Sequence, residues 1–353
     1  MVRIISKILK KLLPKFLFLI LKNIYFYFFG PVLIVKFLKS FFFLNKRIEI
    51  VDKDLVLIGQ IQRSGGTLLS QLFDGHSELY NYPSELELTE PTWDWGKNFN
   101  FSTVEQNLHL KNNILSQNYE KLSTGKIDHK TRNKFIFNPF IEKKIFQKFK
   151  TNDLRSNFNA YFTAFYNAFI NYNNNKNNKK KFITAFLPRF MTIDENIDFF
   201  FQIYPNGKLI NIIRDPRSWL ISAKRHSRSY EDTLASLDLW KKNCENLLKY
   251  KNKYFEKIIL IKFDDLIKNT EMTMRKICLV ININFEESLL SPTFNGELIN
   301  SDSSFKSVIG TVDKSVLQTK TKTKNLILSN DDIKMLEIYE SWYQDFIKKI
   351  NLN

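Results

Sequence analysis

From residue 54 to the C-terminus, short apolar runs alternate with longer stretches whose apolar residues recur at helical spacing. The short runs predict strands, at 55–58, 181–186, 208–213 and 257–263. The periodic stretches predict helices, at 67–73, 158–172, 193–204, 218–226, 232–250, 271–283 and 331–350. Strands that alternate with helices usually form parallel sheets covered on both faces. The pattern therefore predicts an α/β fold with a mostly parallel sheet flanked by helices.

Residues 1–50 differ from the rest of the chain and are predicted as an apolar, basic segment that precedes a domain at 51–353. The run 16–35 has the roughly 20 mostly apolar residues that a membrane span requires. Lys22 interrupts this run, and Gly30-Pro31 would kink it. Three alternatives are open: an imperfect span, a helix in the membrane interface with its lysines reaching the headgroups, or an apolar collar packed on the domain. The segment favours membrane association, and the pattern does not decide between spanning and lying flat.

The chain carries a formal net charge of +17 over 353 residues. This charge favours anionic partners, and the candidates are an anionic nucleotide, an acceptor substrate and a membrane surface. No helix-turn-helix, zinc-finger or RNA-binding motif occurs in the sequence, so we expect no nucleic-acid partner. The two cysteines, Cys244 and Cys278, have no spacing that indicates a disulfide framework or a metal site.

A strand, a glycine-rich turn and a helix start follow one another between residues 54 and 76. This order directs backbone N–H groups and a helix N-terminus at one point, which is a common way to bind phosphate. An ordinary strand-to-helix turn would have the same pattern. Arg63 places a fixed cation in the turn, and this favours the anion-binding interpretation.

A second candidate anion site follows the strand predicted at 208–213. Arg214 stands at the carboxyl end of that strand, and Pro216 suits the first turn of the next helix. Ser222 lies two turns into this helix, where its hydroxyl and the Arg214 guanidinium can converge on one anion. Carboxyl ends of strands are where open α/β sheets bind ligands.

Neither site matches the Walker A loop of ATP-binding proteins, which reads G-x-x-x-x-G-K-[ST]. Gly59 and Gly65 are one residue too far apart, and Gly66 stands at the lysine position. Phosphoryl transfer from ATP places a high charge on the transferred group and normally requires Mg²⁺. A sulfuryl group carries less charge, so cationic side chains and backbone amides can support its transfer without a metal.

Three glutamates, Glu85, Glu87 and Glu90, lie in a stretch at 78–91 that is predicted as a loop. Carboxylates beside a positive site do not bind phosphate, so they are solvated charges or one of them is a general base. His76 is a further candidate base, although a histidine near a helix end more often caps the helix or interacts with its dipole.

These motifs resemble the sulfotransferases that use 3'-phosphoadenosine 5'-phosphosulfate, a family with a P-loop-like α/β fold. Residues 62–69 are similar to the family's 5'-phosphosulfate loop, P-[RK]-S-G-T-T-x-[LW], and 212–222 to its 3'-phosphate site. Asp264-Asp265-Leu266 matches the E-D-L motif after a late family strand, and 303–310 resembles the loop that closes over the nucleotide. The resemblance extends from residue 54 to the C-terminus.

The resemblance also implies roles for individual residues. Those expected to bind the donor nucleotide are Arg63, Ser64, Gly65, Gly66, Thr67, Leu68, Arg214, Ser222 and Lys306. Arg63 is also expected to be catalytic, because it would stabilise the charge that grows on the leaving phosphate. Glu85 is the expected base, with Glu87 next, by analogy with the spacing between the loop arginine and the base in related enzymes. No metal is expected.

Three positions depart from the family pattern. Gln62 replaces the usual proline, and Gly66 replaces the usual threonine, which removes one hydroxyl contact to the phosphosulfate. Many bacterial members have Lys-x-Pro before the strand predicted at 208–213, and here Phe186 occupies the lysine position. Arg189, one residue after this motif, is a candidate second cation.

The expected function is transfer of a sulfuryl group from 3'-phosphoadenosine 5'-phosphosulfate to a hydroxyl or amine of an unidentified acceptor, such as a glycan or lipid. The alternatives are a P-loop kinase or NTPase, and a non-catalytic, membrane-attached nucleotide-binding module. The acceptor walls are expected within residues 93–172. We expect membrane association, with the catalytic domain in the cytoplasm if the chain is bacterial and in the Golgi lumen if it is eukaryotic.

Overall fold

The chain divides into two units, Met1–Ile50 and Val51–Asn353. The structure is a computed structural model and describes residues 48–88, 94–95, 99, 137–169, 172, 179–300, 308–317 and 328–351. The apolar run at 16–35 therefore lies outside the described residues. Within the described part of the chain, no helix combines the length and apolar character that crossing a membrane requires. The membrane-associating segment stays a prediction.

A parallel β-sheet forms the centre of the second unit. Across the described residues it has five strands: β1 (Asp54–Ile58), β2 (Leu79–Glu85), β3 (Phe182–Phe186), β4 (Lys208–Ile213) and β5 (Ile258–Lys262). Their order is β2-β3-β1-β4-β5, and every neighbouring pair is parallel. The strand β1, which leads into the glycine-rich turn, therefore lies between β3 and β4. The α/β fold with a parallel sheet is confirmed.

The strand β2 corrects the sequence-based prediction that residues 78–91 form a loop. Leu79–Glu85 pairs with β3, and Glu85 lies opposite Phe186. Pro83 conceals this strand in the sequence, and it is tolerated because β2 lies at the edge of the sheet. The pairing is irregular around this proline. Glu85 is thus held at the carboxyl end of a strand, at the same edge of the sheet as the glycine-rich turn.

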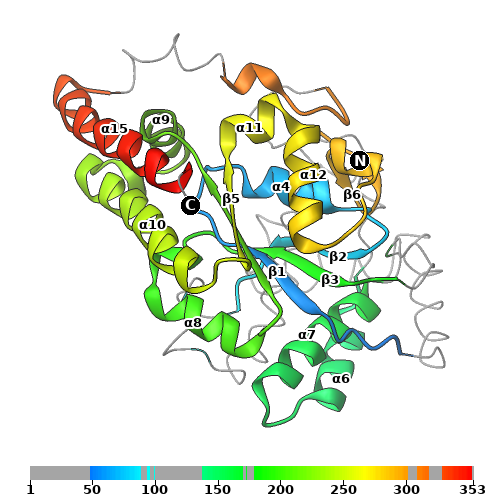
Figure 1. The fold of residues 1–353 in the computed structure, drawn as a ribbon. Coiled ribbons are helices and arrows are strands. Elements are labelled where there is room, and N and C mark those ends of the chain that lie inside the picture. Colours follow the sequence, from blue (N-terminus) through cyan, green and yellow to red (C-terminus); the bar gives the residue numbers. More distant parts are fainter. Residues whose placement is uncertain are drawn as a thin grey trace, which may run out of the picture. The chain divides into compact units, whose positions relative to one another are not determined.

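Helices cover both faces of the sheet (Figure 1). They are α4 (Gly66–Phe73), α6 (Pro139–Phe149), α7 (Leu154–Ala168), α8 (Asp194–Ile203), α9 (Pro216–His226), α10 (Thr233–Lys253), α11 (Phe263–Lys268), α12 (Thr270–Ile281) and α15 (Asn330–Asn351). Shorter elements are the 3-10 helices η3 (Phe190–Thr192), η4 (Arg228–Tyr230), η5 (Glu287–Leu290) and η6 (Lys314–Leu317), and the hairpin of β6 (Thr293–Phe294) and β7 (Glu297–Leu298). The helices predicted from the periodic stretches are all present, with ends that shift by a few residues.

The strand β4 shows how the two faces are built, because successive side chains of a strand point to opposite faces. Ile210 and Ile212 belong to a hydrophobic core that includes residues of α4, α11 and α12. Asn211, between them, donates from its amide to Asn243 Oδ1 of α10 at 3.1 Å and to Gly59 O at 3.4 Å. Full burial of one such isoleucine contributes roughly 1.5–3 kcal/mol. The first face is therefore apolar, and the second includes a polar contact that reaches the end of β1.

The C-terminal helix α15 holds α9, the helix that follows Arg214. Arg217 of α9 donates from Nε and Nη2 to the two carboxylate oxygens of Glu340, each at 2.6 Å. Lys224 of α9 pairs with Asp332 at 3.2 Å, and Asp332 also accepts a hydrogen bond from Thr233 of α10. Two-pronged arginine–carboxylate pairs fix orientation as well as distance. These contacts join α9, α10 and α15 beside the carboxyl end of β4.

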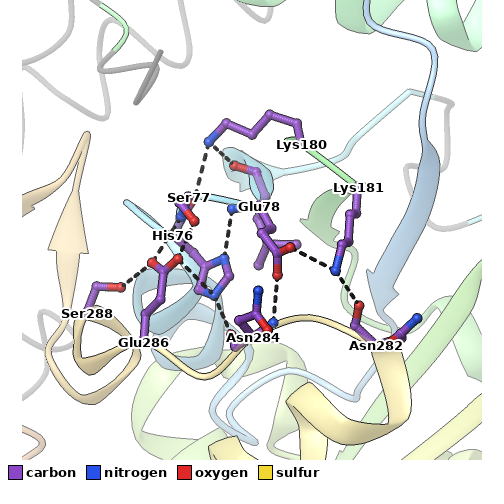
Figure 2. Close-up of polar contacts among 10 residues, drawn as sticks. His76, Ser77, Glu78, Lys180, Lys181, Asn282, Asn284, Glu286 and Ser288 are labelled. Atoms are coloured by element: carbon purple, nitrogen blue, oxygen red, sulfur yellow. Dashed lines mark hydrogen bonds and ion pairs between the residues drawn. The ribbon is translucent and has the colours of Figure 1, made fainter. Parts of the chain in front are cut away.

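A cluster of polar side chains fixes the turn that follows α4 (Figure 2). The buried His76 donates from Nε2 to Asn284 O at 2.9 Å and accepts at Nδ1 from Glu78 N at 3.1 Å. The Glu78 carboxylate accepts from Asn284 N at 2.6 Å and pairs with Lys181 at 2.8 Å. Burial lowers the pKa of His76 and so favours the neutral ring that this arrangement requires. The cluster ties the end of α4 to the segment after α12 and to the start of β3, so His76 has a structural role there.

Removal of the Glu78 charge tests this cluster. Burial acts to raise the pKa of Glu78, but the hydrogen bonds from Lys181 and from Asn284 N outweigh it, and the pKa is lowered. We expect Glu78→Gln to decrease the free energy of unfolding by about 1–2 kcal/mol at pH 7, because the buried Glu78 carboxylate loses charged hydrogen bonds from Asn284 N and from the partly exposed Lys181. Urea unfolding of the two proteins measures this difference.

The control is Glu231→Gln, because the pair between Glu231 and Arg228 is exposed, and we expect a change below about 0.5 kcal/mol. A lowered carboxyl pKa stabilises the fold above the unfolded-state pKa of about 4.3, and this stabilisation is lost as the pH falls through the folded-state pKa. The difference between the wild type and Glu78→Gln should therefore shrink below about pH 4. Equal stability of these two proteins at pH 7 would contradict the role of the cluster.

Candidate functional site

The turn between β1 and α4 places a helix N-terminus at the end of a strand. Arg63 and Gly65 both have left-handed backbone conformations, with φ of 65° and 99°. Gly65 is the N-cap of α4, and no side chain caps the helix there, so the first-turn N–H groups can be satisfied by a ligand. A Cβ at residue 65 would lie 2.8 Å from a carbon of the Phe263 ring. Glycine is therefore required at this position both by the backbone conformation and by the available space.

A pocket of about 430 Å³ borders this turn. Among the residues with an expected role in binding or catalysis, those that line it are Arg63, Gly65, Gly66, Thr67, Leu68, Glu85, Arg214 and Ser222. Ser64 is buried and does not line the pocket, so its expected contact with the donor stays a prediction. Lys306 and Glu90 lie outside the described residues. The two candidate anion sites thus form one pocket at the carboxyl ends of the strands.

Two arginines from distant segments meet in this pocket. Arg63 Nε donates to Ser222 Oγ at 3.4 Å, and Arg214 Nη1 donates to Arg63 O at 3.1 Å. The Arg214 guanidinium lies over the Phe263 ring, 4.4 Å from its centroid, and the residue is only 8% exposed. Trp240 Nε1 donates to Arg214 O at 3.1 Å, which fixes the backbone at the end of β4. Arg214 is buried and Arg63 is partly buried, and a cation shielded from bulk water interacts more strongly with anions, so the pocket suits an anionic ligand.

Glu85 brings a carboxylate into the wall of the same pocket. The residue is exposed to solvent and to the pocket space, although nearby protein atoms still reduce the hydration of its carboxylate. Burial, followed by the charge of Glu87 and a hydrogen bond with it, raises the pKa of Glu85 to about 7. A carboxylate with a pKa near neutral can take a proton from a substrate and release it again. The geometry thus combines two cations with one group suited to proton transfer.

Arg189 supports the turn from behind. It has a left-handed backbone with φ of 65°, and its N–H donates to Gln60 O at 2.9 Å. Its guanidinium donates to Gln62 Oε1 at 2.8 Å and to Tyr230 OH at 3.1 Å. Arg189 does not line the pocket, whereas its neighbour Pro188 does. The contacts fit a positioning role for Arg189, and its role as a second cation stays a prediction.

Several pocket residues had no role in the sequence analysis. They are Gln60, His226, Phe263, Ile267, Asp313 and Val316. Phe263 was detectable in principle, because it immediately precedes the Asp264-Asp265-Leu266 motif. Asp313 and Val316 lie just after the stretch 303–310, which resembles the loop that closes over the nucleotide, but neither residue was itself expected at the site. Only the folding of 308–317 onto this edge of the sheet brings them to the pocket.

Neither a disulfide nor a metal site accompanies the pocket in the part of the chain that the structure describes. Cys244 and Cys278 are free and buried. Within the described residues, no group of three or more His, Cys, Asp or Glu side chains could hold a metal ion. This observation does not test the reaction, so the metal-free mechanism stays a prediction.

Comparisons with known proteins found similar solved structures. None of the curated proteins matches the chain. Solved structures similar to it include a sulfotransferase domain from the curacin biosynthetic pathway, with 17% identity, a TM-score of 0.46, and coverage of 83% of this chain and 99% of that one. A sulfotransferase from Alicyclobacillus acidocaldarius has 12% identity, a TM-score of 0.40, and coverage of 83% and 97%. Mouse sulfotransferase SULT7A1 complexed with PAP has 14% identity, a TM-score of 0.36, and coverage of 83% and 84%.

The family model described as "Sulfotransferase family" matches residues 55–287. This match includes β1, the glycine-rich turn and α4, and it continues through Arg214, α9 and α11. It covers more than half of the chain and all of the described pocket residues except Asp313 and Val316. The chain therefore belongs to the sulfotransferase family.

Proposed function

We propose that this sulfotransferase uses 3'-phosphoadenosine 5'-phosphosulfate as donor and transfers its sulfuryl group to a hydroxyl or amine. The observation that carries the proposal is the convergence of Arg63, Arg214, Ser222 and Glu85 on one pocket. A donor with phosphate groups at both its 5' and 3' positions requires two anion sites, and a transfer to a hydroxyl requires a base. The pocket has candidates for all three.

The donor's two ends would be bound by different elements. The 5'-phosphosulfate would accept hydrogen bonds from Arg63, from the backbone N–H groups of 64–67 and from the Thr67 hydroxyl, at the N-terminus of α4. The 3'-phosphate would be bound by Arg214 and Ser222. Arg63 Nε lies 3.4 Å from Ser222 Oγ, so the proposed 5'-phosphosulfate and 3'-phosphate sites are adjacent. Lys306 would contribute from the C-terminal loop.

In the proposed reaction the acceptor oxygen or nitrogen attacks sulfur, and the bond between sulfur and the bridging phosphate oxygen breaks. The proton of the acceptor passes to the Glu85 carboxylate, and the electron pair of the broken bond stays on the 5'-phosphate. Arg63 and the N–H groups of the turn would stabilise the charge that grows there. The products are the sulfated acceptor and 3',5'-adenosine bisphosphate. Glu87 is the alternative base.

The acceptor class and the site of action are proposed more broadly. We propose a glycan or a lipid as the acceptor, because the N-terminal segment is apolar and basic. We also propose that residues 1–50 associate the protein with a membrane. Bacterial origin would put the catalytic domain in the cytoplasm, and eukaryotic origin in the Golgi lumen. Use of the donor does not depend on the acceptor class or on the location.

Nucleotide binding provides the first test. We expect the protein to bind 3',5'-adenosine bisphosphate and to bind ATP with Mg²⁺ much more weakly, as measured by calorimetric titration. Arg214→Ala should weaken binding of the bisphosphate about 10- to 100-fold, because it removes charged hydrogen bonds to the 3'-phosphate. Arg228→Ala is the control, since the Arg228 side chain is 94% exposed and is outside the pocket.

Two outcomes would contradict the donor assignment. Tight binding of ATP with Mg²⁺, accompanied by hydrolysis, would support a kinase or NTPase instead. The protein could also bind 3',5'-adenosine bisphosphate but release none of it from 3'-phosphoadenosine 5'-phosphosulfate with phenolic, sugar or glycolipid acceptors. That result would support a non-catalytic nucleotide-binding module.

The role of Glu85 predicts a specific pH dependence. Its pKa is raised to about 7, and a base acts in its deprotonated form. The wild-type rate should therefore rise with pH, reach half of its maximum at about pH 7 and level off roughly one pH unit above that. Glu85→Gln should reduce kcat by about 10²–10⁴-fold and abolish this rise. The rate of bisphosphate release from the donor, in the presence of an active acceptor, measures both.

Glu87→Gln is the matched comparison, because the charge of Glu87 raises the pKa of Glu85. We expect this variant to keep most of its kcat and to shift the rise to lower pH. A loss of kcat in Glu87→Gln, with full activity in Glu85→Gln, would transfer the role of base to Glu87. Binding of 3',5'-adenosine bisphosphate should be retained in both variants.

A further inference from the structure

Gln60 lies in the donor pocket although no sequence motif draws attention to it. It follows β1 by two residues, is 2% exposed and lines the pocket. Its Oε1 is a buried polar atom that has no hydrogen-bond partner within the described residues. Buried polar atoms without partners are rare in folded proteins and are costly. An anionic ligand cannot satisfy this oxygen, because both groups accept hydrogen bonds, so the amide nitrogen is the group of Gln60 that could donate to an anion in the pocket.

The position of Gln60 explains the glycine at residue 66. A Cβ added to Gly66 would lie 1.8 Å from Gln60 Nε2 and 2.4 Å from Gln60 Cδ. Such distances are far below van der Waals contact, so the carboxamide occupies the space that a side chain at residue 66 would take. The sulfotransferase loop that this segment resembles has a threonine at this position. In this chain, a side chain from residue 60 fills the place of a side chain from residue 66.

We infer that Gln60 is a further donor-binding residue, whose carboxamide replaces the hydroxyl missing at Gly66 and donates to an oxygen of the 5'-phosphosulfate. This inference rests on the proposed use of that donor. The Gln60 amide nitrogen is the carboxamide atom nearest to the position that a side chain at residue 66 would occupy, at the start of α4. The amide nitrogen can thus face an anion beside the N–H groups at the start of α4. Hydrogen bonds to charged acceptors are stronger than those between neutral groups.

The overlap between a side chain at residue 66 and the Gln60 carboxamide makes substitutions at residues 60 and 66 depend on each other. Threonine at residue 66 is incompatible with the Gln60 side chain, because its Cβ would overlap the carboxamide. Truncation of Gln60 to alanine removes this overlap and reopens the space. A loop with alanine at 60 and threonine at 66 would therefore regain the family's hydroxyl while losing the carboxamide. A residue that only filled space would show the same steric coupling, so the test must also identify which end of the ligand is affected.

The test compares two nucleotides that differ only at the 5' end. Calorimetric titrations of the full chain with 3',5'-adenosine bisphosphate and with adenosine 3'-phosphate would be made for the wild type, Gln60→Ala, Gln60→Glu and the double variant Gln60→Ala/Gly66→Thr. Gln60→Glu keeps the shape of the side chain, so it guards against a loss of folding. Gln71→Ala is the control, because Gln71 is a glutamine of α4 that does not line the pocket.

We expect Gln60→Ala to weaken binding of the bisphosphate about 10-fold or more, and Gln60→Glu to weaken it further through charge repulsion. Adenosine 3'-phosphate should bind both variants as it binds the wild type, since it lacks the 5'-phosphate. The double variant should recover most of the lost affinity for the bisphosphate. Gln71→Ala should bind both nucleotides like the wild type.

Equal binding of the bisphosphate by the wild type, Gln60→Ala and Gln60→Glu would overturn the inference. An equal loss for both nucleotides would also overturn it, because it would indicate a general disturbance of the pocket. In either case a retained effect of Arg214→Ala would leave the proposed function intact. If the wild type bound neither nucleotide, the proposed function itself would fail.

Discussion

The left-handed backbone of the turn between β1 and α4 is the constraint on which the rest of the site depends. Gly65 at φ of 99° lets the chain reverse within van der Waals contact of the Phe263 ring, and this brings β5 and α11 against the start of α4. Arg63, also left-handed, presents its carbonyl to Arg214 and its side chain to Ser222. A single turn thus joins the segments that form both halves of the pocket. Strained backbone of this kind persists only where the surroundings hold it, and here neighbouring side chains do so.

Polar side chains from several elements contact the turn. Trp219 Nε1 of α9 donates to Gln62 O at 2.7 Å, and Arg189 holds the side chain of the same residue. Behind α4, the cluster around His76 and Glu78 anchors the far end of the helix (Figure 2). Contacts at both ends of α4 therefore fix the position of this helix. Such support is what a site for a charged ligand requires, because electrostatic stabilisation depends on dipoles that do not reorganise.

The two cations and the carboxylate of the pocket come from the ends of different strands. Arg63 and Arg214 lie where the strands β1 and β4 end, and Glu85 lies where the edge strand β2 ends. A carboxylate in this pocket is partly desolvated and is close to Glu87, which explains a pKa of about 7. Its place on an edge strand holds it at a fixed distance from the turn, as a free loop would not. One sheet edge thus combines anion binding and proton transfer.

The sequence by itself determined the alternation of strands and helices, the glycine-rich turn and the Arg214–Ser222 pair, because each depends on local spacing and backbone preference. It did not reveal β2, since an edge strand with Pro83 lacks the pattern of a buried one. It also hid Gln60, whose role depends on the space above Gly66, and Asp313, which reaches the pocket only through the fold. Contacts between residues far apart in sequence, and the burial that shifts a pKa, exist only once the chain has packed. The tertiary structure alone therefore decided which of the candidate groups share one pocket.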